Sequence, residues 1–228
     1  MNAIYNPLKL SVYRHLFQDK KVLIIGGGAV GSYVGENVTK MGSSVSLVDF
    51  DTFTLENAAK HSGIIHTPED AGKNKARCIA ERVRPLLEEG CISHGVDADL
   101  CMLGPEVIAA YDVVILCVDN FAAKALCNEL YMAIPAERRP IVIMDGTYDE
   151  MAQSVIMDGK DFCVRCLLDE KWLKDGAVRT SCSGPQIREI DGEPEIVRTS
   201  GLASSMAANL SAEQYRAAVI GAEEVMNR

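Results

Sequence analysis

Three glycines and an aspartate near the amino end of the chain have the spacing of a nucleotide site. Gly26, Gly28 and Gly31 fit the pattern G-x-G-x-x-G, between an apolar run and a segment with helical periodicity. Small residues let the backbone approach a phosphate, and the free N–H groups at the start of a helix attract its negative charge. Asp49 follows eighteen residues after Gly31, where an acid commonly accepts hydrogen bonds from ribose hydroxyls. These residues predict a bound nucleotide, and the motif suits ATP, NAD and FAD equally.

The elements that must position these residues alternate between strands and helices. Residues 21–26 form a continuous apolar run, which is typical of a strand buried on both faces of a parallel sheet. Strands and helices at this spacing predict an α/β fold with a Rossmann-like, doubly wound and mostly parallel sheet. We expect the other strands at 45–50, 91–96, 112–118 and 141–146, and helices at 8–18, 30–41, 71–88, 105–111 and 121–134.

The carboxyl-terminal third of the chain departs from this alternation. Residues 152–157 favour a strand outside the parallel series, whereas residues 158–200 are polar and irregular. Residues 200–227 are rich in alanine and favour a helical segment, with a break expected near Leu210 and Ser211. The fold is therefore expected to carry an elaborated carboxyl-terminal third.

The length and the net charge of the chain limit the number of domains and the classes of function it can have. The chain has 228 residues, of which 48% are hydrophobic, enough for one substantial core. We expect a single domain over residues 1–228, with a nucleotide-binding core at 1–150 and a carboxyl-terminal elaboration at 151–228. The formal net charge of −9 argues against a nucleic-acid partner, because binding a phosphate backbone needs a broad basic surface.

The distribution of apolar residues and cysteines indicates a cytoplasmic protein. No apolar run reaches membrane-spanning length, so no membrane association is expected, and the first residues lack the pattern of a secretory signal. Several of the eight cysteines lie in apolar segments, among them Cys78 and Cys117. A secreted disulfide scaffold would be shorter and richer in loops, so we expect reduced thiols.

Taken in order, the motifs of this chain resemble those of the ThiF/MoeB adenylyltransferases and of the adenylation domain of ubiquitin-activating enzymes. The resemblance covers most of residues 20–225. It implies a Rossmann-like adenylation domain that uses ATP. The segments that carry it are the glycine turn at 26–31, Val48-Asp49-Phe50-Asp51 with Asn57, Ala71-Gly72-Lys73-Asn74-Lys75-Ala76, Cys117-Val118-Asp119-Asn120-Phe121, Cys163-Val164-Arg165-Cys166 and Ser181-Cys182.

The resemblance implies roles for the polar residues around the glycine turn. The turn would cradle the ATP phosphates, Asp49 would hold the ribose, and Asp51 would line the same pocket. Asn57 and Lys75 match positions that contact the phosphates. A solvated helix lysine is the alternative for Lys75 considered alone.

Asp119 matches the aspartate that organises Mg²⁺ at the reacting phosphate. Asn120 lies beside it at the carboxyl end of the fourth expected strand, where ligands of such sheets gather. The alternative for Asp119 is a helix N-cap for the segment 121–134.

The implied reaction is adenylation of the carboxyl-terminal glycine of a small ubiquitin-like or sulfur-carrier protein, by an enzyme that forms a homodimer. A terminal carboxylate is already ionised near neutral pH, so the reaction needs no general base. It needs in-line positioning and neutralisation of the phosphate charge. Mg²⁺ held by Asp119, together with Lys75 and other cations, would supply this neutralisation.

Two lysines stand where the family usually has arginine. Lys60 lies three residues after Asn57, and Lys124 lies five residues after Asp119. Lysine keeps the charge but loses the two-pronged phosphate contact of arginine. Lys60 still counts with Lys75 and Asp119 as a catalytic candidate. Some relatives also use an arginine from a partner subunit, for which Arg14 is the nearby candidate.

The cysteines near the carboxyl end leave the question of zinc open. Cys163 and Cys166 match the first half of a four-cysteine zinc site, but the remaining sequence holds no second C-x-x-C. Cys182 is a candidate third ligand, or a reactive thiol as in some relatives, or an unreactive thiol. The alternative is a metal-free loop.

Two other function classes remain open from the sequence. A nicotinamide-dependent oxidoreductase explains the glycine turn and Asp49 but leaves Asn57, Lys75 and Asp119 without roles. A non-catalytic dimeric scaffold of the same fold is motivated by the missing arginines. Within the adenylation class, another carboxylate, such as a peptide terminus or a modified tRNA base, is a related substrate.

Overall fold

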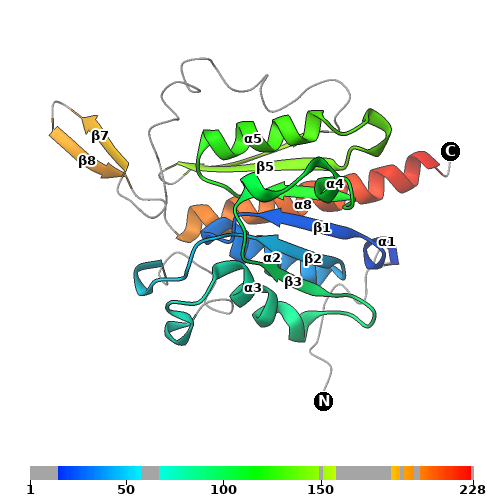
Figure 1. Cartoon of the computed structure of the whole chain (residues 1–228), viewed down its shortest axis with the longest axis horizontal. Coiled ribbons are helices and arrows are strands. Elements are labelled where there is room, and N and C mark those ends of the chain that lie inside the picture. Colours follow the sequence, from blue (N-terminus) through cyan, green and yellow to red (C-terminus); the bar gives the residue numbers. More distant parts are fainter. Residues whose placement is uncertain are drawn as a thin grey trace.

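A six-stranded sheet with helices on both faces forms the centre of the protein (Figure 1). The strands lie in the order β3-β2-β1-β4-β5-β6. The first five are parallel, and β6 runs antiparallel to β5. The expected doubly wound, mostly parallel sheet is therefore confirmed. Its strands are β1 (Lys21–Ile25), β2 (Ser44–Val48), β3 (Ser93–Val96), β4 (Val113–Leu116), β5 (Ile141–Tyr148) and β6 (Met151–Met157).

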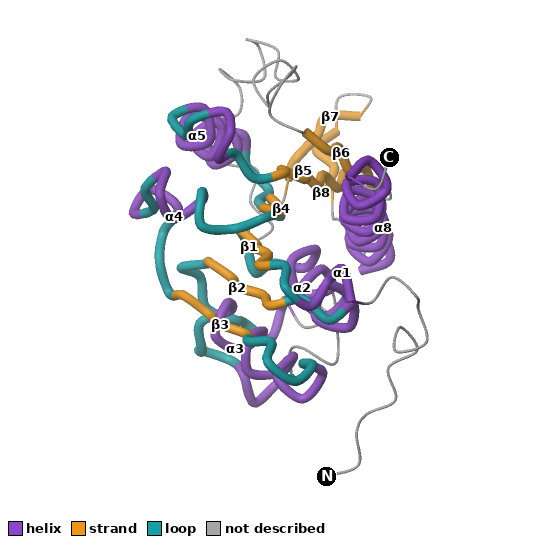
Figure 2. Tube along the Cα trace, turned by 90° about the vertical axis from the view of Figure 1, so that its right-hand side faces the viewer, coloured by secondary structure: helices purple, strands orange, loops and turns teal. Residues whose placement is uncertain are grey.

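The helices divide between the two faces of the sheet (Figure 2). One face carries α2, α3 and α8, and the other carries α4 and α5. The helices are α1 (His15–Gln18), α2 (Ala29–Met41), α3 (Lys75–Val83), α4 (Pro105–Ile108), α5 (Phe121–Met132) and α8 (Gly201–Met226). The computed structural model describes residues 15–57, 67–148, 151–157, 186–190, 193–197 and 201–226.

Strand β1 shows why the sequence contains an unbroken apolar run. Val22 and Ile24 point into the core under α2 and α8. Leu23 and Ile25 point into the opposite core, under α4 and α5. Successive side chains of a strand face opposite sides, so a strand covered on both sides must be apolar at every position. The strand order reverses at β1, which places the following glycine turn at the switch point where such sheets bind ligands.

Three expectations about local structure were wrong. The expected break near Leu210 and Ser211 is absent, because α8 is continuous from Gly201 to Met226. The Ser211 hydroxyl is buried and donates to Asp145, so it does not compete with the helix backbone. Within residues 158–200, expected to be irregular, β7 (Gln186–Ile190) and β8 (Glu193–Val197) form an antiparallel pair.

The third error concerns the start of α3, which begins at Lys75 and not at residue 71. Asn74 has extended backbone and caps the helix with its side chain. The helix then gives way to a 3₁₀ turn, Arg84–Leu86, at Pro85, because proline lacks the N–H that would continue the helical ladder.

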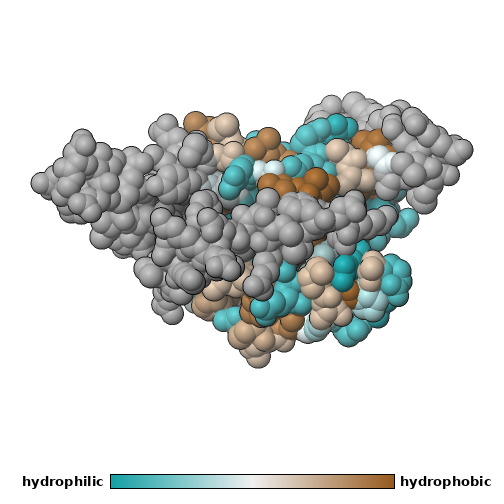
Figure 3. Space-filling view, turned by 90° about the horizontal axis from the view of Figure 1, so that it is seen from above, coloured by the Kyte–Doolittle hydropathy of each residue, from teal (hydrophilic) through white to brown (hydrophobic). Residues whose placement is uncertain are grey.

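The described surface mixes polar and apolar side chains (Figure 3). Large exposed apolar residues occur on separate elements, such as Phe50 after β2, Met102 before α4 and Leu202 on α8. Among the described residues, no helix combines the length and apolar character needed to cross a bilayer. Cys78, Cys91, Cys101, Cys117 and Cys127 are all free thiols.

Candidate active site

The glycine turn between β1 and α2 is shaped by close backbone contacts. Gly26 has a φ of +99°, and a Cβ there would lie 2.7 Å from the carbonyl oxygen of Cys117. A Cβ on Gly31 would lie 1.9 Å from the carbonyl oxygen of Gly26. Neither position tolerates a side chain, because the space is filled at both, and at Gly26 the left-handed φ would also strain any other residue.

Gly28 differs from both, because no heavy atom of the described residues, apart from its chain neighbours, lies within 4 Å of the Cβ it would carry. It is the N-cap of α2 and provides no side-chain cap. The turn therefore presents open space at a helix N-terminus whose backbone N–H groups and dipole favour an anion. This arrangement fits the phosphates of a nucleotide.

Asp49 connects the end of β2 to the glycine turn. Its Oδ2 accepts a hydrogen bond of 2.5 Å from the backbone N–H of Gly27, and its Oδ1 accepts one of 2.7 Å from that of Asp51. Burial raises the pKa of Asp49, although these two hydrogen bonds act against the shift. Asp49 thus positions the turn, a role additional to the ribose contact predicted from the sequence.

Lys75 brings a buried cation to the same place. Its side chain is 8% exposed, and its Nζ lies 3.0 Å from Oδ2 of Asp51. Its backbone N–H donates to the Asp51 carbonyl, which fixes the start of α3 against the loop after β2. A Cβ on Gly27 would lie 3.3 Å from the Lys75 Cβ. The structure therefore gathers Lys75, Asp51 and Asp49 beside the glycine turn.

Asn74 is a residue of this site that the sequence reasoning left without a role. Its Nδ2 donates to the carbonyl oxygens of Asp49, at 2.8 Å, and Asp51, at 3.2 Å. Its Oδ1 accepts from the backbone N–H of Arg77 and so caps α3. One amide thus joins two elements of the site. An asparagine directly before a helix is a recognisable cap signal, but its contacts with the loop after β2 are tertiary.

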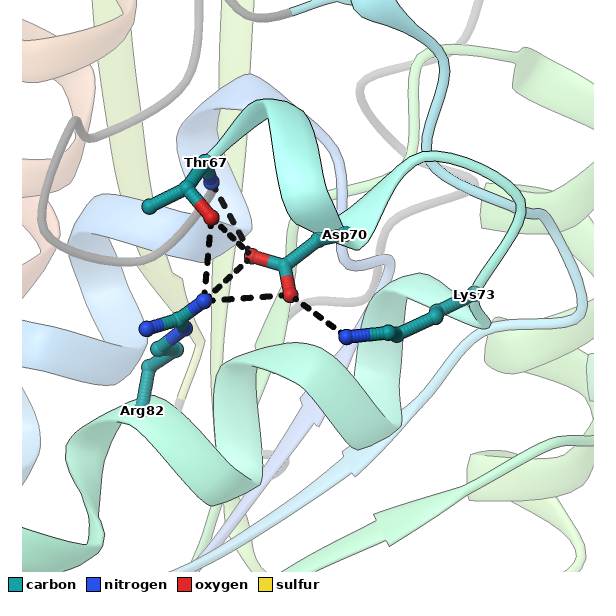
Figure 4. A network of polar contacts seen from close by, with 4 residues as sticks. All are labelled: Thr67, Asp70, Lys73 and Arg82. Carbon is teal, nitrogen blue, oxygen red and sulfur yellow. Dashed lines mark hydrogen bonds and ion pairs between the residues drawn. The ribbon is translucent and has the colours of Figure 1, made fainter.

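A network around Asp70 holds the turn that leads into α3 (Figure 4). The Asp70 carboxylate accepts hydrogen bonds from Thr67, Lys73 and Arg82. Burial acts to raise the pKa of Asp70, but these hydrogen bonds outweigh it and lower the pKa to about 2. The carboxylate therefore stays ionised near neutral pH. The same turn exchanges two backbone hydrogen bonds with Phe53, which is fully buried.

Asp119 and Asn120 follow β4 at the neighbouring strand end. Asp119 is exposed. Asn120 is the N-cap of α5, and its Oδ1 accepts a hydrogen bond of 2.7 Å from the Ala123 backbone. The alternative that Asp119 caps this helix is therefore wrong. Lys124, one turn into α5, is buried, and its Nζ donates to the backbone carbonyl of Asp145 at 3.1 Å.

The donors available for a metal suit Mg²⁺ bound together with a nucleotide. The described part of the chain contains no group of three or more His, Cys, Asp or Glu that could hold a metal alone. Mg²⁺ is usually held by one or two carboxylates plus substrate phosphates. Asp119 is an exposed carboxylate two residues after Cys117, whose carbonyl lies against Gly26 of the glycine turn, so its type and place fit such a site.

The remaining sequence candidates divide into two groups. Asn57 lies in a 3₁₀ turn, Leu55–Asn57, and its amide donates to the Thr54 hydroxyl of the same loop. The others lie outside the described residues, and their roles stay predictions: Arg14, Lys60, Cys163, Cys166 and Cys182.

The doubly wound sheet, the open glycine turn and the acid at the end of β2 together define a Rossmann-like nucleotide-binding protein. Its family follows from the sequence pattern of the ThiF family, which matches residues 6–226. The chain belongs to the ThiF family, a family of ATP-binding adenylyltransferases.

Curated relatives are similar over part of their length. The chain is 27% identical over 173 residues to SUMO-activating enzyme subunit 2 of Dictyostelium discoideum, covering 74% of this chain and 25% of that protein. It is 29% identical over 160 residues to molybdopterin-synthase adenylyltransferase of Escherichia coli (strain K12), covering 66% and 59%. The chain therefore spans less than two thirds of either relative.

Solved structures share the fold at lower identity. E. coli MccB with ATP superposes with a TM-score of 0.67 at 18% identity, covering 90% of this chain and 57% of that one. TcdA (CsdL) also gives a TM-score of 0.67 at 18% identity, covering 95% and 93%. These likenesses establish the fold and leave the substrate open.

Proposed function

We propose that this protein uses ATP to adenylate the carboxyl-terminal glycine of a small ubiquitin-like or sulfur-carrier protein. The observation that carries the proposal is the ion pair of buried Lys75 with partly exposed Asp51 beside an open glycine turn, with Asp119 at the next strand end. A nicotinamide-dependent enzyme would use the glycine turn and Asp49, but the Lys75–Asp51 ion pair and Asp119 would have no role in it. Relatives named molybdopterin-synthase adenylyltransferase and SAMP-activating enzyme E1, the latter from Haloferax volcanii, support this class of partner.

In the proposed reaction, an oxygen of the terminal carboxylate attacks the α-phosphorus of ATP. A new oxygen–phosphorus bond forms, the bond from that phosphorus to the bridging oxygen breaks, and pyrophosphate leaves with the bonding electrons. The products are an acyl-adenylate and pyrophosphate. No proton needs to be removed, because the carboxylate is already ionised near neutral pH.

Each residue of the site then has a defined task. The backbone N–H groups at the start of α2 hold the phosphates, and Asp49 keeps the turn in place while it faces the ribose. Lys75 neutralises phosphate charge from a buried position, and Asn57 and Lys60 add contacts from the following loop. Asp119 would hold Mg²⁺, which lowers the charge on the phosphate oxygens as a Lewis acid. The proposal includes a homodimer acting in the cytoplasm.

The test is ATP–pyrophosphate exchange by the purified protein. We expect exchange when a small protein ending in Gly-Gly, encoded beside its gene, is added with ATP and Mg²⁺. The same partner with its terminal glycine removed is the matched control and should give no exchange. If no Gly-Gly protein supports exchange but a short peptide with a free carboxyl terminus does, the substrate is a peptide and not a carrier protein. Failure with all carboxylates would contradict adenylation.

A further inference from the structure

A buried carboxylate contacts Cys117, which packs against the glycine turn, and the proposed reaction does not use this carboxylate. Asp145 on β5 is 3% exposed. Its Oδ1 accepts a hydrogen bond from the Ser211 hydroxyl on α8, and its Oδ2 accepts one from the Cys117 thiol at 3.3 Å. Ser154 on β6 also interacts with the carboxylate and bonds Ser211 at 2.8 Å. Burying a carboxylate is unfavourable unless its contacts compensate, so this cluster calls for a physical explanation.

Lys124 supplies the positive charge next to this carboxylate. Its side chain is held by the bond to the Asp145 backbone carbonyl. Burial lowers the pKa of Lys124, while the charges of Asp145, Asp119 and Cys117 act to raise it. The ammonium is therefore coupled both to the buried acid and to the aspartate assigned to Mg²⁺.

Cys117 links the same carboxylate to the glycine turn. Its backbone N–H donates to the Ile25 carbonyl at 2.8 Å, which joins β4 to β1. Its carbonyl oxygen lies against Gly26, where a Cβ would come within 2.7 Å. Asp119 follows two residues later in the chain. Cys117 is thus the contact between the phosphate-binding turn and the loop that carries Asp119.

We propose that Asp145 is a positioning residue of the adenylation site, which holds Cys117 and Lys124 and thereby fixes Asp119 relative to the glycine turn. This inference rests on the proposed function, because it assigns Asp145 a task in Mg-ATP binding. Through Ser211, the same carboxylate also ties α8 to that site, although Ser211 lies 66 residues away in the sequence.

The protonation of Asp145 gives the inference a signature that a purely structural role lacks. Burial raises its pKa to about 6, with the hydrogen bonds from Ser211, Cys117 and Ser154 and the Lys124 charge acting against the shift. A raised pKa means that the folded state favours the protonated acid. The stabilising contribution of this group is therefore present below its ordinary pKa and is lost as pH rises through about 6. At acid pH, protonated Asp145 therefore contributes more to folding stability. Protonation also removes the negative charge beside Lys124.

The experiment measures Mg-ATP binding by calorimetry, with thermal unfolding alongside, for wild type and Asp145→Asn from about pH 5.5 to about pH 8. ATP itself takes up a proton in this range, so the ratio of the two affinities is the readout. We expect the variant to bind about tenfold more weakly at the upper end and like wild type at the lower end. Asp97→Asn, an exposed acid after β3, is the control and should give a ratio near one throughout.

Ser211→Ala provides a second readout should Asp145→Asn fail to fold. The Ser211 hydrogen bond lowers the pKa of Asp145, so its loss raises that pKa. The fall in Mg-ATP affinity on acidification, called the acid limb, will then occur at higher pH. An affinity ratio that stays constant with pH, or an acid limb that does not move, would overturn the inference while leaving the proposed function standing. Wild type that binds no Mg-ATP at any pH would overturn the proposed function and the inference with it.

Discussion

Replacing Asp119 with alanine will reduce ATP–pyrophosphate exchange by at least about 100-fold. In the proposed site, this carboxylate holds the Mg²⁺ that offsets the phosphate charge, and loss of one such group removes several kcal/mol of transition-state stabilisation. The fold should be retained, because Asp119 is exposed and the cap of α5 is provided by Asn120. Exchange rates and circular dichroism on the same preparations provide the measurement.

The matched control for this variant is Asp97→Ala, which removes an exposed acid after β3 at the same edge of the sheet. It should exchange pyrophosphate at the wild-type rate. If Asp119→Ala kept full exchange, the metal assignment would be wrong. If wild type and variant were both inactive while the protein still performed its cellular role, a non-catalytic scaffold would be the better account.

Replacing Gly31 with alanine will disrupt the glycine turn and cost about 3 kcal/mol or more of unfolding free energy. The new Cβ would lie 1.9 Å from the Gly26 carbonyl oxygen, so α2 and the end of β1 must move apart. Urea unfolding measures the loss. A variant as stable as wild type would show that the helix does not pack on the turn as described.

Gly28→Ala is the partner experiment at the same turn. In the part of the chain that the structure describes, the new methyl group meets no atom within 4 Å beyond its chain neighbours, so the folded state should change little in stability. It would enter the open space assigned to the phosphates, and we expect Mg-ATP affinity to fall by at least about tenfold. Unchanged affinity in Gly28→Ala would place the phosphates elsewhere.

The sequence predicted the parts of this site that depend on local spacing. Gly26, Gly28 and Gly31 lie within six residues, and their motif requires a strand before it and a helix after it. Both elements are present, as are the alternating strands and helices of the parallel sheet. The unbroken apolar run predicted β1 because a strand buried on both faces needs an apolar residue at every position.

Contacts between distant residues could not be predicted in the same way. Asp145 and Ser211 meet because β5 and α8 pack together. Neither residue lies in a local sequence motif that predicts this contact. A serine inside a helix can bond its own backbone, but the Ser211 hydroxyl bonds Asp145 instead and the expected break is absent. Asp145 is a single acid within an expected strand, and nothing in its local sequence indicates that it is buried.

The pair β7 and β8 was missed for a different reason. Asp191-Gly192 separates these strands in the sequence, and Asp-Gly between short apolar–polar runs is a strong hairpin signal. The polar and charged composition of residues 158–200 predicted an irregular segment, whereas the two-residue Asp-Gly spacing predicts a hairpin. The structure agrees with the spacing.

The most direct test of the account is a crystal structure of the protein with Mg²⁺ and a non-hydrolysable ATP analogue. We predict that the phosphates lie at the start of α2, that the ribose lies near Asp49, and that Asp119 contacts the metal. A structure with no nucleotide at the glycine turn, or with Asp119 directed into the protein interior, would contradict it.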